Sequence, residues 1–194
     1  FNPDGSESEM CGNGIRCFAR YLHDRGLSDQ ETLTIATGAG VQVVRLLSDG
    51  GVISGVEVDM GRPEFRADRV PVTAETVEVV DRPLSVDGVE VVISCVSMGN
   101  PHAVAFVDDL GSFPLERVGP MVEHHSWFPR RTNFEICRVV DRGHVDMRVW
   151  ERGAGLTLAC GTGACGAMAV ARRHGLVDST VEMRLPGGSL RLSW

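Results

Sequence analysis

Hydrophobic positions along the chain recur with two periods, and together they predict many strands and few helices. A helix is expected from about Cys11 to Arg25, where Phe18, Tyr21 and Leu22 share a helical spacing. A second is expected from about Cys160 to His174, and its run from Ala164 to Ala171 is apolar nearly all round, as a buried helix requires. A short third helix is expected at Leu115–His125.

Apolar stretches between glycine-rich turns predict the strands. They are expected at Thr32–Ala36, Val41–Leu47, Val52–Met60, Glu90–Met98, Ala103–Val107, Phe134–Val140, Val145–Glu151, Val181–Leu185 and Leu190–Trp194. Residues 1–10 are expected to be extended and then to form a loop. The fold class is therefore α+β, with mostly antiparallel sheets wrapped around central helices.

The chain repeats itself at a fixed distance. Cys11-Gly12-Asn13-Gly14 opens the first helix, and Cys160-Gly161-Thr162-Gly163 opens the second, 149 positions later (160 − 11). The same offset pairs Gly26 with Gly175, Leu27 with Leu176, Asp29 with Asp178, Gly38 with Gly187, and Phe1 with Trp150. Two pseudo-symmetric domains are expected, each presenting a thiol at the beginning of its helix.

The domain boundary is expected near Met60-Gly61-Arg62-Pro63, which gives domains at residues 1–60 and 61–194. Only ten residues precede Cys11, whereas about a hundred separate the boundary from Cys160. The repeat therefore predicts that the first domain is incomplete at its start in this chain, and that it leaves apolar surface exposed.

Composition excludes several classes of function. A net charge of −7 argues against a nucleic-acid partner, because affinity for the phosphate backbone is largely cationic. The longest apolar runs are too short to span a membrane. All 19 basic residues are arginine, so this segment supplies neither the lysine that holds pyridoxal phosphate nor the lysine of a P-loop. No cofactor and no metal are expected, and moderate cysteine content without C-x-x-C pairs favours reduced cytoplasmic thiols.

A cysteine at a helix N-terminus lies beside free N–H groups and a partial positive charge. We expect this position to lower the pKa of Cys11 and of Cys160 and to favour the thiolate. The adjacent glycines let backbone N–H groups approach a carboxylate closely. Two matched thiols predict chemistry that treats both faces of one carbon alike, which is racemisation or epimerisation.

Plainer interpretations apply to other residues. A free cysteine is usually a small buried hydrophobe, and this is expected for Cys17, Cys95, Cys137 and Cys165. The segment Gly161–Gly166 fits the G-x-G-x-x-G pattern of dinucleotide-binding proteins, but the context lacks the alternating strand–helix units of that fold. Glu151-Arg152 could be a surface ion pair, although it stands nine residues before Cys160, as Asn2 does before Cys11.

The motifs in combination resemble those of the diaminopimelate epimerase family, which inverts one stereocentre of diaminopimelate in lysine and peptidoglycan precursor biosynthesis. They are Asn2–Glu7 leading into Glu9–Cys17, then Gly99-Asn100-Pro101-His102, Thr132-Asn133, Glu151–Gly155 and Ala159–Cys165. The resemblance implies a fold of two pseudo-symmetric domains, and a cytoplasmic isomerase that needs no pyridoxal phosphate or other cofactor.

The resemblance also implies roles for individual residues. Cys11 and Cys160 would be the two catalytic bases, with His102 and Glu151 as supporting groups near the reacting centre. Asn2, Asn100, Asn133, Glu151 and Arg152 would bind substrate, since amides and guanidinium suit an ammonium–carboxylate pair. Gly12-Asn13 and Gly161-Thr162 would hold the reacting carboxylate through backbone N–H groups.

Three alternatives stay open at this point. The chain could be a related racemase that also works without pyridoxal phosphate, such as a proline racemase relative. It could be a thiol redox or metal-binding protein that uses Cys11 and Cys160, or a binding module without activity. The expected partner is a small-molecule substrate, with no nucleic acid and no membrane, and a homodimer is one assembly open to the chain.

Overall fold

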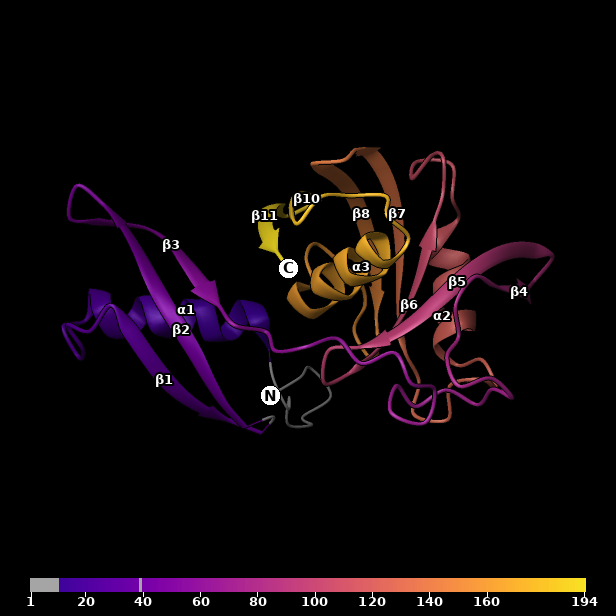
Figure 1. Cartoon of the computed structure of the whole chain (residues 1–194), viewed down its shortest axis with the longest axis horizontal. Coiled ribbons are helices and arrows are strands. Elements are labelled where there is room, and N and C mark those ends of the chain that lie inside the picture. Colours follow the sequence, from indigo (N-terminus) through magenta and orange to yellow (C-terminus); the bar gives the residue numbers. More distant parts are fainter. Residues whose placement is uncertain (1–10, 39) are drawn as a thin grey trace. The chain divides into compact units, whose positions relative to one another are not determined.

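The computed structural model describes residues 11–38 and 40–194, and the chain divides into two compact units, Phe1–Gly61 and Arg62–Trp194. In the first unit, helix α1 (Gly12–Asp24) lies against a three-stranded antiparallel sheet (Figure 1). The sheet is formed by β1 (Thr32–Thr37), β2 (Gly40–Asp49) and β3 (Val52–Val58), with a register shift between Leu47 and Ser48.

The core of the first unit is small. Ile15 and Ala19 of α1 pack on Leu33, Val44 and Leu46 of the sheet. Phe18 and Tyr21 do not join this core, since 47% and 50% of their surfaces are exposed. The helical spacing was therefore correct in period, but the buried face of α1 is that of Ile15, Ala19 and Leu22.

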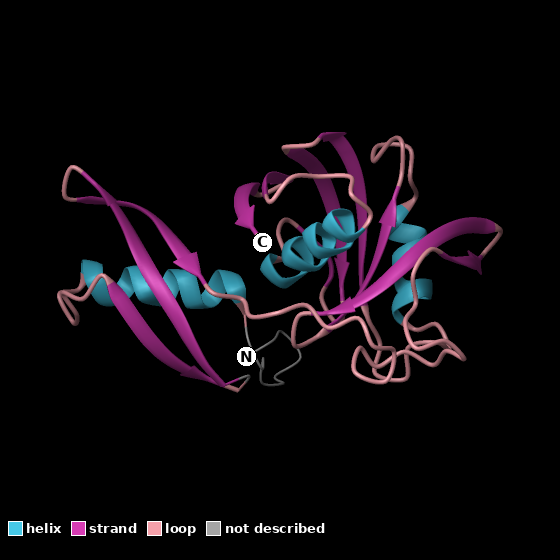
Figure 2. Cartoon of the chain, viewed as in Figure 1, coloured by secondary structure: helices cyan, strands magenta, loops and turns pink. Residues whose placement is uncertain are grey.

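The second unit contains an eight-stranded sheet. Its strands are β4 (Arg82–Val86), β5 (Val89–Ser97), β6 (Pro101–Phe106), β7 (Asn133–Asp141), β8 (His144–Glu151), β9 (Gly155–Thr157), β10 (Thr180–Leu185) and β11 (Gly188–Ser193). The spatial order is β11-β10-β8-β7-β6-β5-β4, with β9 paired to β8. The second unit also contains the helices α2 (Leu115–Glu123) and α3 (Gly161–Arg173). Figure 2 shows the helices in cyan and the strands in magenta.

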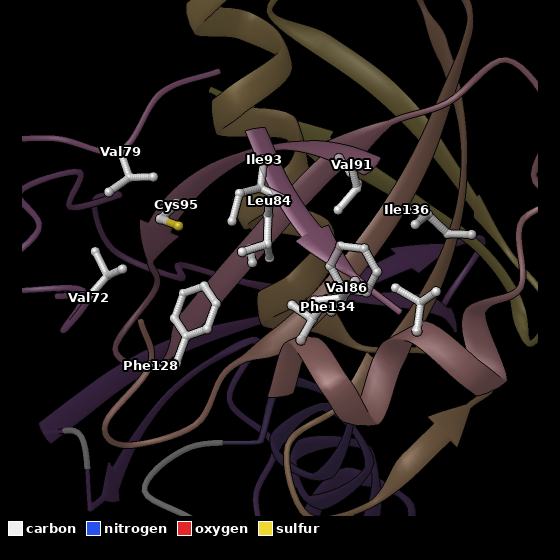
Figure 3. Packing of buried hydrophobic residues seen from close by; sticks show 14 of the residues in the cluster. Val72, Val79, Leu84, Val86, Val91, Ile93, Cys95, Phe128, Phe134 and Ile136 are labelled. Carbon is white, nitrogen blue, oxygen red and sulfur yellow. The ribbon is translucent and has the colours of Figure 1, made fainter. Parts of the chain in front are cut away.

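Alternation along the strands divides this core between the two faces of the sheet. Phe134 and Ile136 of β7 face one way, into the cluster that contains Leu115 and Val118 of α2, part of which is seen in Figure 3. Cys137 belongs to the cluster on the other face, which contains Ala164, Ala167, Met168, Val170 and Ala171 of α3. The sheet thus wraps around α3, as the apolar character of that helix predicts, and α2 covers the other face.

Two parallel pairs correct the sequence interpretation, which found no strand–helix–strand units. Strand β6 pairs parallel to β7 across α2, and β8 pairs parallel to β10 across α3. The remaining pairs of the described sheets are antiparallel. The fold is α+β and mostly antiparallel, and the β6–β7 crossover places His102 and Glu135 on the α3 face.

Two strands were not predicted. Strand β4 contains Pro83, which cannot donate to a ladder and which made the segment look unlike a strand; it is an edge strand, where proline is tolerated. Strand β9 has three residues, which is too short for a periodic pattern. The other helices and strands match their predicted positions within a few residues at each end. Among the described residues, no helix is both long and apolar enough to cross a membrane.

Candidate functional site

The two cysteine-capped helices are equivalent in detail. Each helix has 13 residues, and both first and last residues keep the 149-position offset. Cys11 and Cys160 both cap their helices with extended backbone, at φ −128° and ψ 107° and 114° respectively. Both helices end at a glycine with positive φ, Gly26 at 62° and Gly175 at 70°. The repeat predicted from the sequence is thus present in both caps.

The equivalence continues into the following hairpins with one residue lost. Strands β1 and β10 begin at Thr32 and Thr180, 148 positions apart (180 − 32), and both are followed by an antiparallel partner. The sequence predicted an offset of 149 positions that continues without a gap through Gly38 and Gly187. In the hairpins the observed offset is 148, so this part of the prediction is wrong by one residue. Phe1, the predicted counterpart of Trp150, lies outside the described residues.

Each cap brings a sulfur to the first backbone N–H groups of its helix. Gly14 N donates to Cys11 Sγ at 3.3 Å, and Gly163 N donates to Cys160 Sγ at 3.4 Å. A Cβ atom on Gly14 would meet Cys11 Sγ at 3.4 Å, which is an ordinary contact. A Cβ on Gly163 would lie 3.2 Å from Cys160 Sγ and 2.6 Å from Glu135 Oε1, so only glycine fits there without a shift.

The surroundings of the two sulfurs differ. Cys11 is exposed, whereas Cys160 is 5% exposed and belongs to the α3 core. Burial raises the pKa of the Cys160 thiol well above its usual range, and the carboxylate of Glu151 raises it further. The hydrogen bonds from Thr162 and Gly163 oppose this shift but are smaller. The expected lowering of the Cys160 pKa is therefore wrong, because desolvation outweighs the helix terminus.

The other cysteines divide into two kinds. Cys95 and Cys137 are fully buried, as predicted, and burial raises the pKa of the Cys95 thiol to about 12. Cys17 is exposed and Cys165 is half-buried, so the prediction of buried hydrophobes is wrong for Cys17. Cys17 lies away from the narrow face of α1 that packs on its sheet.

A hydrogen-bond chain leads from the interior of the sheet to Cys160. His102 of β6 is fully buried; its Nε2 lies 3.0 Å from Asn100 Oδ1. Asn100 Nδ2 donates to Thr162 Oγ1 at 3.3 Å, and Thr162 Oγ1 lies 3.5 Å from Cys160 Sγ. The predicted residues Asn100, His102, Cys160 and Thr162 are thus linked in one chain.

Glu151 is the last residue of β8, and Arg152 follows it directly. The Glu151 carboxylate is close enough to Cys160 to raise the pKa of its thiol. Thr157 Oγ1 donates a hydrogen bond to Glu151 Oε1. The backbone N–H of Arg152 donates to Asn133 Oδ1 at 2.9 Å, and Asn133 Nδ2 donates to the carbonyl of Pro101 at 2.9 Å. Asn133 is 3% exposed, so its amide holds two backbone segments together at this end of the sheet.

In the first unit, Gly12 and Asn13 occupy the first turn of α1. Arg16 Nη2 donates to Asn13 Oδ1 at 2.6 Å, and Arg16 Nε donates to the carbonyl of Gly12 at 3.1 Å. Arg16 therefore ties its own side chain to the first turn of α1, next to Cys11. Asn2 lies outside the described residues.

The comparisons with known proteins decide the family. The profile described as Diaminopimelate epimerase matches residues 1–66 and 94–194. The diaminopimelate epimerase of Moorella thermoacetica is 50% identical over the whole chain, which spans 70% of that relative. Diaminopimelate epimerase 1 of a Nostoc species is also 50% identical, again over the whole chain and 70% of the relative.

The chain belongs to the diaminopimelate epimerase family. Solved structures agree on the fold. A hydroxyproline epimerase from Agrobacterium vitis superposes with a TM-score of 0.73 at 18% identity, over 97% of this chain and 58% of that one. A phenazine biosynthesis protein of the PhzF family from Bacillus anthracis gives a TM-score of 0.67 at 20% identity, over 98% and 68%. The chain spans less than two thirds of the hydroxyproline epimerase.

Two residues of this diaminopimelate epimerase homologue were missed in the sequence. Glu135 is fully buried on β7, with its Oε1 2.7 Å from His102 Nδ1. Glu123 is 3% exposed and accepts from Trp150 Nε1 at 2.8 Å and from Gly153 N at 2.9 Å. The available signal was an acidic residue inside an apolar run, Phe134-Glu135-Ile136-Cys137 and Met121-Val122-Glu123. A buried acid must be paired, so each predicts a partner.

Proposed function

We propose that this protein interconverts LL- and meso-diaminopimelate by proton transfer at one α-carbon, with Cys11 and Cys160 as the two acid/base groups. The observation that carries the proposal is the matched pair of cysteine N-caps, the same in backbone angles and in the N–H donor to each sulfur. Membership of the diaminopimelate epimerase family supports the substrate.

In the proposed step, a thiolate on one cysteine removes the α-proton, so the C–H bond breaks and an S–H bond forms. The electron pair left on carbon delocalises into the substrate carboxylate. The thiol of the other cysteine then gives its proton to the opposite face of the carbon, which restores a C–H bond with inverted configuration. The first sulfur now carries the α-proton and the second is a thiolate; exchange of protons with water between turnovers restores the starting pair.

The environment of Cys160 supports a starting state for this reaction. Burial and the carboxylate of Glu151 keep the Cys160 pKa raised, so this group rests as the thiol. A resting thiol can act as the proton donor of the pair. The same burial makes a Cys160 thiolate a strong base once it forms, as removal of a weakly acidic α-proton requires.

The first turns of α1 and α3 are the proposed sites for the reacting carboxylate. Gly12-Asn13 and Gly161-Thr162 lie in the first turns of α1 and α3, and a helix N-terminus favours negative charge. As charge moves from carbon into the carboxylate, these dipoles stabilise it. Asn100, Arg152 and Asn2 are proposed substrate contacts, and His102, Asn133 and Glu151 are proposed to hold these groups in place.

We propose a cytoplasmic location, because the reaction needs both cysteines in the reduced form. An oxidised or disulfide-bonded cysteine can neither take nor give a proton, and glutathione keeps cytosolic thiols reduced. Lysine and peptidoglycan precursor biosynthesis is the proposed pathway, with no cofactor and with a small molecule as partner.

The test uses the full-length protein in deuterated water with LL-diaminopimelate. Wild-type protein should form the meso isomer and incorporate deuterium at one α-carbon. C11S and C160S should each lose epimerisation by several orders of magnitude, while substrate binding measured by calorimetry is largely kept. Full activity of either single variant would refute the two-cysteine assignment, and turnover of proline in place of diaminopimelate would favour the racemase alternative.

A further inference from the structure

Glu135 is the one described side chain with a fully buried polar atom that lacks a partner. It lies near the start of β7, and its carboxyl group is shut off from solvent on the face covered by α3. Its Oε1 is 2.7 Å from His102 Nδ1, whereas its Oε2 has no hydrogen-bond partner among the described residues. The catalytic scheme above gives this carboxyl group no task.

The parallel pairing of β6 with β7 creates the contact. Val104 is the register partner of Glu135, and His102 is the register partner of Asn133. His102 and Glu135 therefore point to the same face, two positions apart along their strands. Gly166 of α3 packs over them, since a Cβ there would come within 3.5 Å of the His102 ring.

The orientation of Asn100 decides which atoms of His102 carry protons. Asn100 donates through Nδ2 to Thr162, so its carbonyl Oδ1 is the atom that faces His102 Nε2 at 3.0 Å. A carbonyl oxygen can only accept, so His102 Nε2 must be the donor. In a neutral imidazole ring, Nδ1 is then an acceptor, and its partner Glu135 Oε1 must bring the proton.

The lack of a hydrogen-bond partner for Glu135 Oε2 is expected if the carboxyl group is neutral. An ionised carboxylate shares its charge between both oxygens, and leaving one buried without a donor would carry a large desolvation penalty. In the neutral acid, Oε1–H donates to His102 and Oε2 is an uncharged carbonyl oxygen, for which the penalty is far smaller. Burial also raises the pKa of Glu135, and the neighbouring carboxylate of Glu151 adds to the shift against the opposing effect of His102.

The hydrogen-bond chain that begins at Glu135 ends at Cys160. Thr162 Oγ1 accepts the proton of Asn100 Nδ2, which leaves its own O–H free to point at Cys160 Sγ, 3.5 Å away. Every donor from Glu135 onward then points toward the sulfur. Chains of hydrogen bonds aligned in one direction polarise each other and favour negative charge at their accepting end.

We propose that Glu135 is a positioning residue for the Cys160 half of the proposed reaction: as a neutral carboxylic acid it donates to His102 Nδ1 and thereby sets the direction of the chain His102–Asn100–Thr162 that ends on Cys160 Sγ. This inference rests on the proposed function for its catalytic consequence. A neutral Glu135 also removes one negative charge from beside the sulfur, so a thiolate at Cys160 forms more easily than beside a carboxylate.

The protonation of the pair is tested first, and this test needs no activity. In the full-length protein at neutral pH, ¹⁵N NMR of the histidine rings should show His102 neutral, with a proton on Nε2 and none on Nδ1. Infrared difference spectra between wild type and E135Q should show a protonated carboxyl band that E135Q lacks. A doubly protonated His102 ring together with the absence of that band would overturn the proposal.

The second test compares two substitutions of similar size. Glu135→Gln keeps a donor for His102 Nδ1, so kcat should stay within about threefold of wild type with KM unchanged. Glu135→Met fills the same space without a donor, and kcat should fall by about tenfold, the rate equivalent of roughly one hydrogen bond. Thermal unfolding of both variants checks that the fold is kept.

The outcomes separate this inference from the proposed function. Equal kcat in E135M and wild type, or an equal loss in E135Q and E135M, would overturn the positioning role of Glu135 while leaving the two-cysteine assignment intact. If wild-type protein epimerises no diaminopimelate at all, the proposed function fails, but the NMR and infrared spectra still decide whether Glu135 is the donor to His102.

Discussion

Cys11 and Cys160 share the same N-cap geometry, with φ at −128° in both, yet the first is exposed and the second is 5% exposed. Each sulfur accepts one backbone N–H, from Gly14 and Gly163 respectively. Identical local geometry is therefore placed in two different dielectric environments.

Glycine at position 163 is required by packing, whereas glycine at the equivalent position 14 is not. In G163A, the new methyl would meet Glu135 Oε1 at 2.6 Å, and the carboxyl group cannot retreat without leaving His102. We expect G163A to lower the free energy of unfolding by about 1–3 kcal/mol. The matched control G14A meets only Cys11 Sγ at 3.4 Å and should be neutral or up to about 1 kcal/mol more stable. Urea unfolding measures both, and an equal effect at the two positions would contradict the packing argument.

Thr162 should support a Cys160 thiolate through its hydroxyl. Thr162→Val keeps the shape but removes both the acceptor for Asn100 and the donor to the sulfur. A hydrogen bond to a charged group contributes about 1.5–3 kcal/mol, so kcat should fall by roughly 10- to 100-fold. Thr162→Ser retains the hydroxyl and should recover most of the rate. Steady-state kinetics with diaminopimelate decide, and wild-type turnover in T162V would exclude this role.

Glu123 should hold the segment after β8 in place. Its two carboxylate oxygens accept from Trp150 Nε1 and from Gly153 N, and the residue is 3% exposed. Glu123→Gln turns one acceptor into a donor and leaves one buried N–H unpaired, so we expect a loss of about 1–3 kcal/mol in stability.

The control for this prediction lies on the same helix. Glu116 pairs with Arg148 at 2.7 Å but has a side chain 59% exposed, so E116Q should cost less than about 1 kcal/mol. Chemical denaturation of the two variants gives both values. Equal losses would show that burial does not distinguish the two acids.

The raised pKa of Glu135 predicts a specific dependence of stability on pH. The unfolded chain releases this proton near a pKa of about 4.3, whereas burial keeps it bound in the folded protein to higher pH. The stabilisation associated with the protonated form is complete below that value and is lost as pH rises toward the folded pKa. E135Q cannot ionise, so its stability relative to wild type should increase as pH rises above about 4.3. His102 and Glu151 remain in both proteins, so unfolding free energies measured across the same pH series isolate Glu135. A constant difference between the two proteins would contradict a raised pKa.

Local signals determined most of the secondary structure. Gly26 and Gly175 end their helices in the left-handed conformation that glycine adopts most easily, and the predicted helices agree with α1 and α3 to within a residue at each end. Strand β4 was missed because Pro83 suggests a break, and only its position at the sheet edge makes it a strand. The partners of a strand are not encoded in its own residues, so the parallel pairing of β6 with β7 could not be predicted.

The residues of the candidate site also divide into those set by local sequence and those set by tertiary contacts. Cys11 and Cys160 were predicted because their motif is contiguous and repeated, and the cap geometry follows from neighbours in the sequence. The pairing of Glu135 with His102 spans 33 positions, and that of Asn100 with Thr162 spans 62. These contacts arise from strand register and helix packing, and the charge states they impose arise from burial.

The sequence by itself therefore determined the repeat, the two thiol-capped helices and the class of chemistry, because each depends on residues adjacent in the chain. Only the tertiary structure decided that Cys160 rests in a low-dielectric core with its pKa raised, although the helix terminus alone favours the opposite shift. Desolvation depends on everything packed around a group, and a one-dimensional pattern does not contain that information.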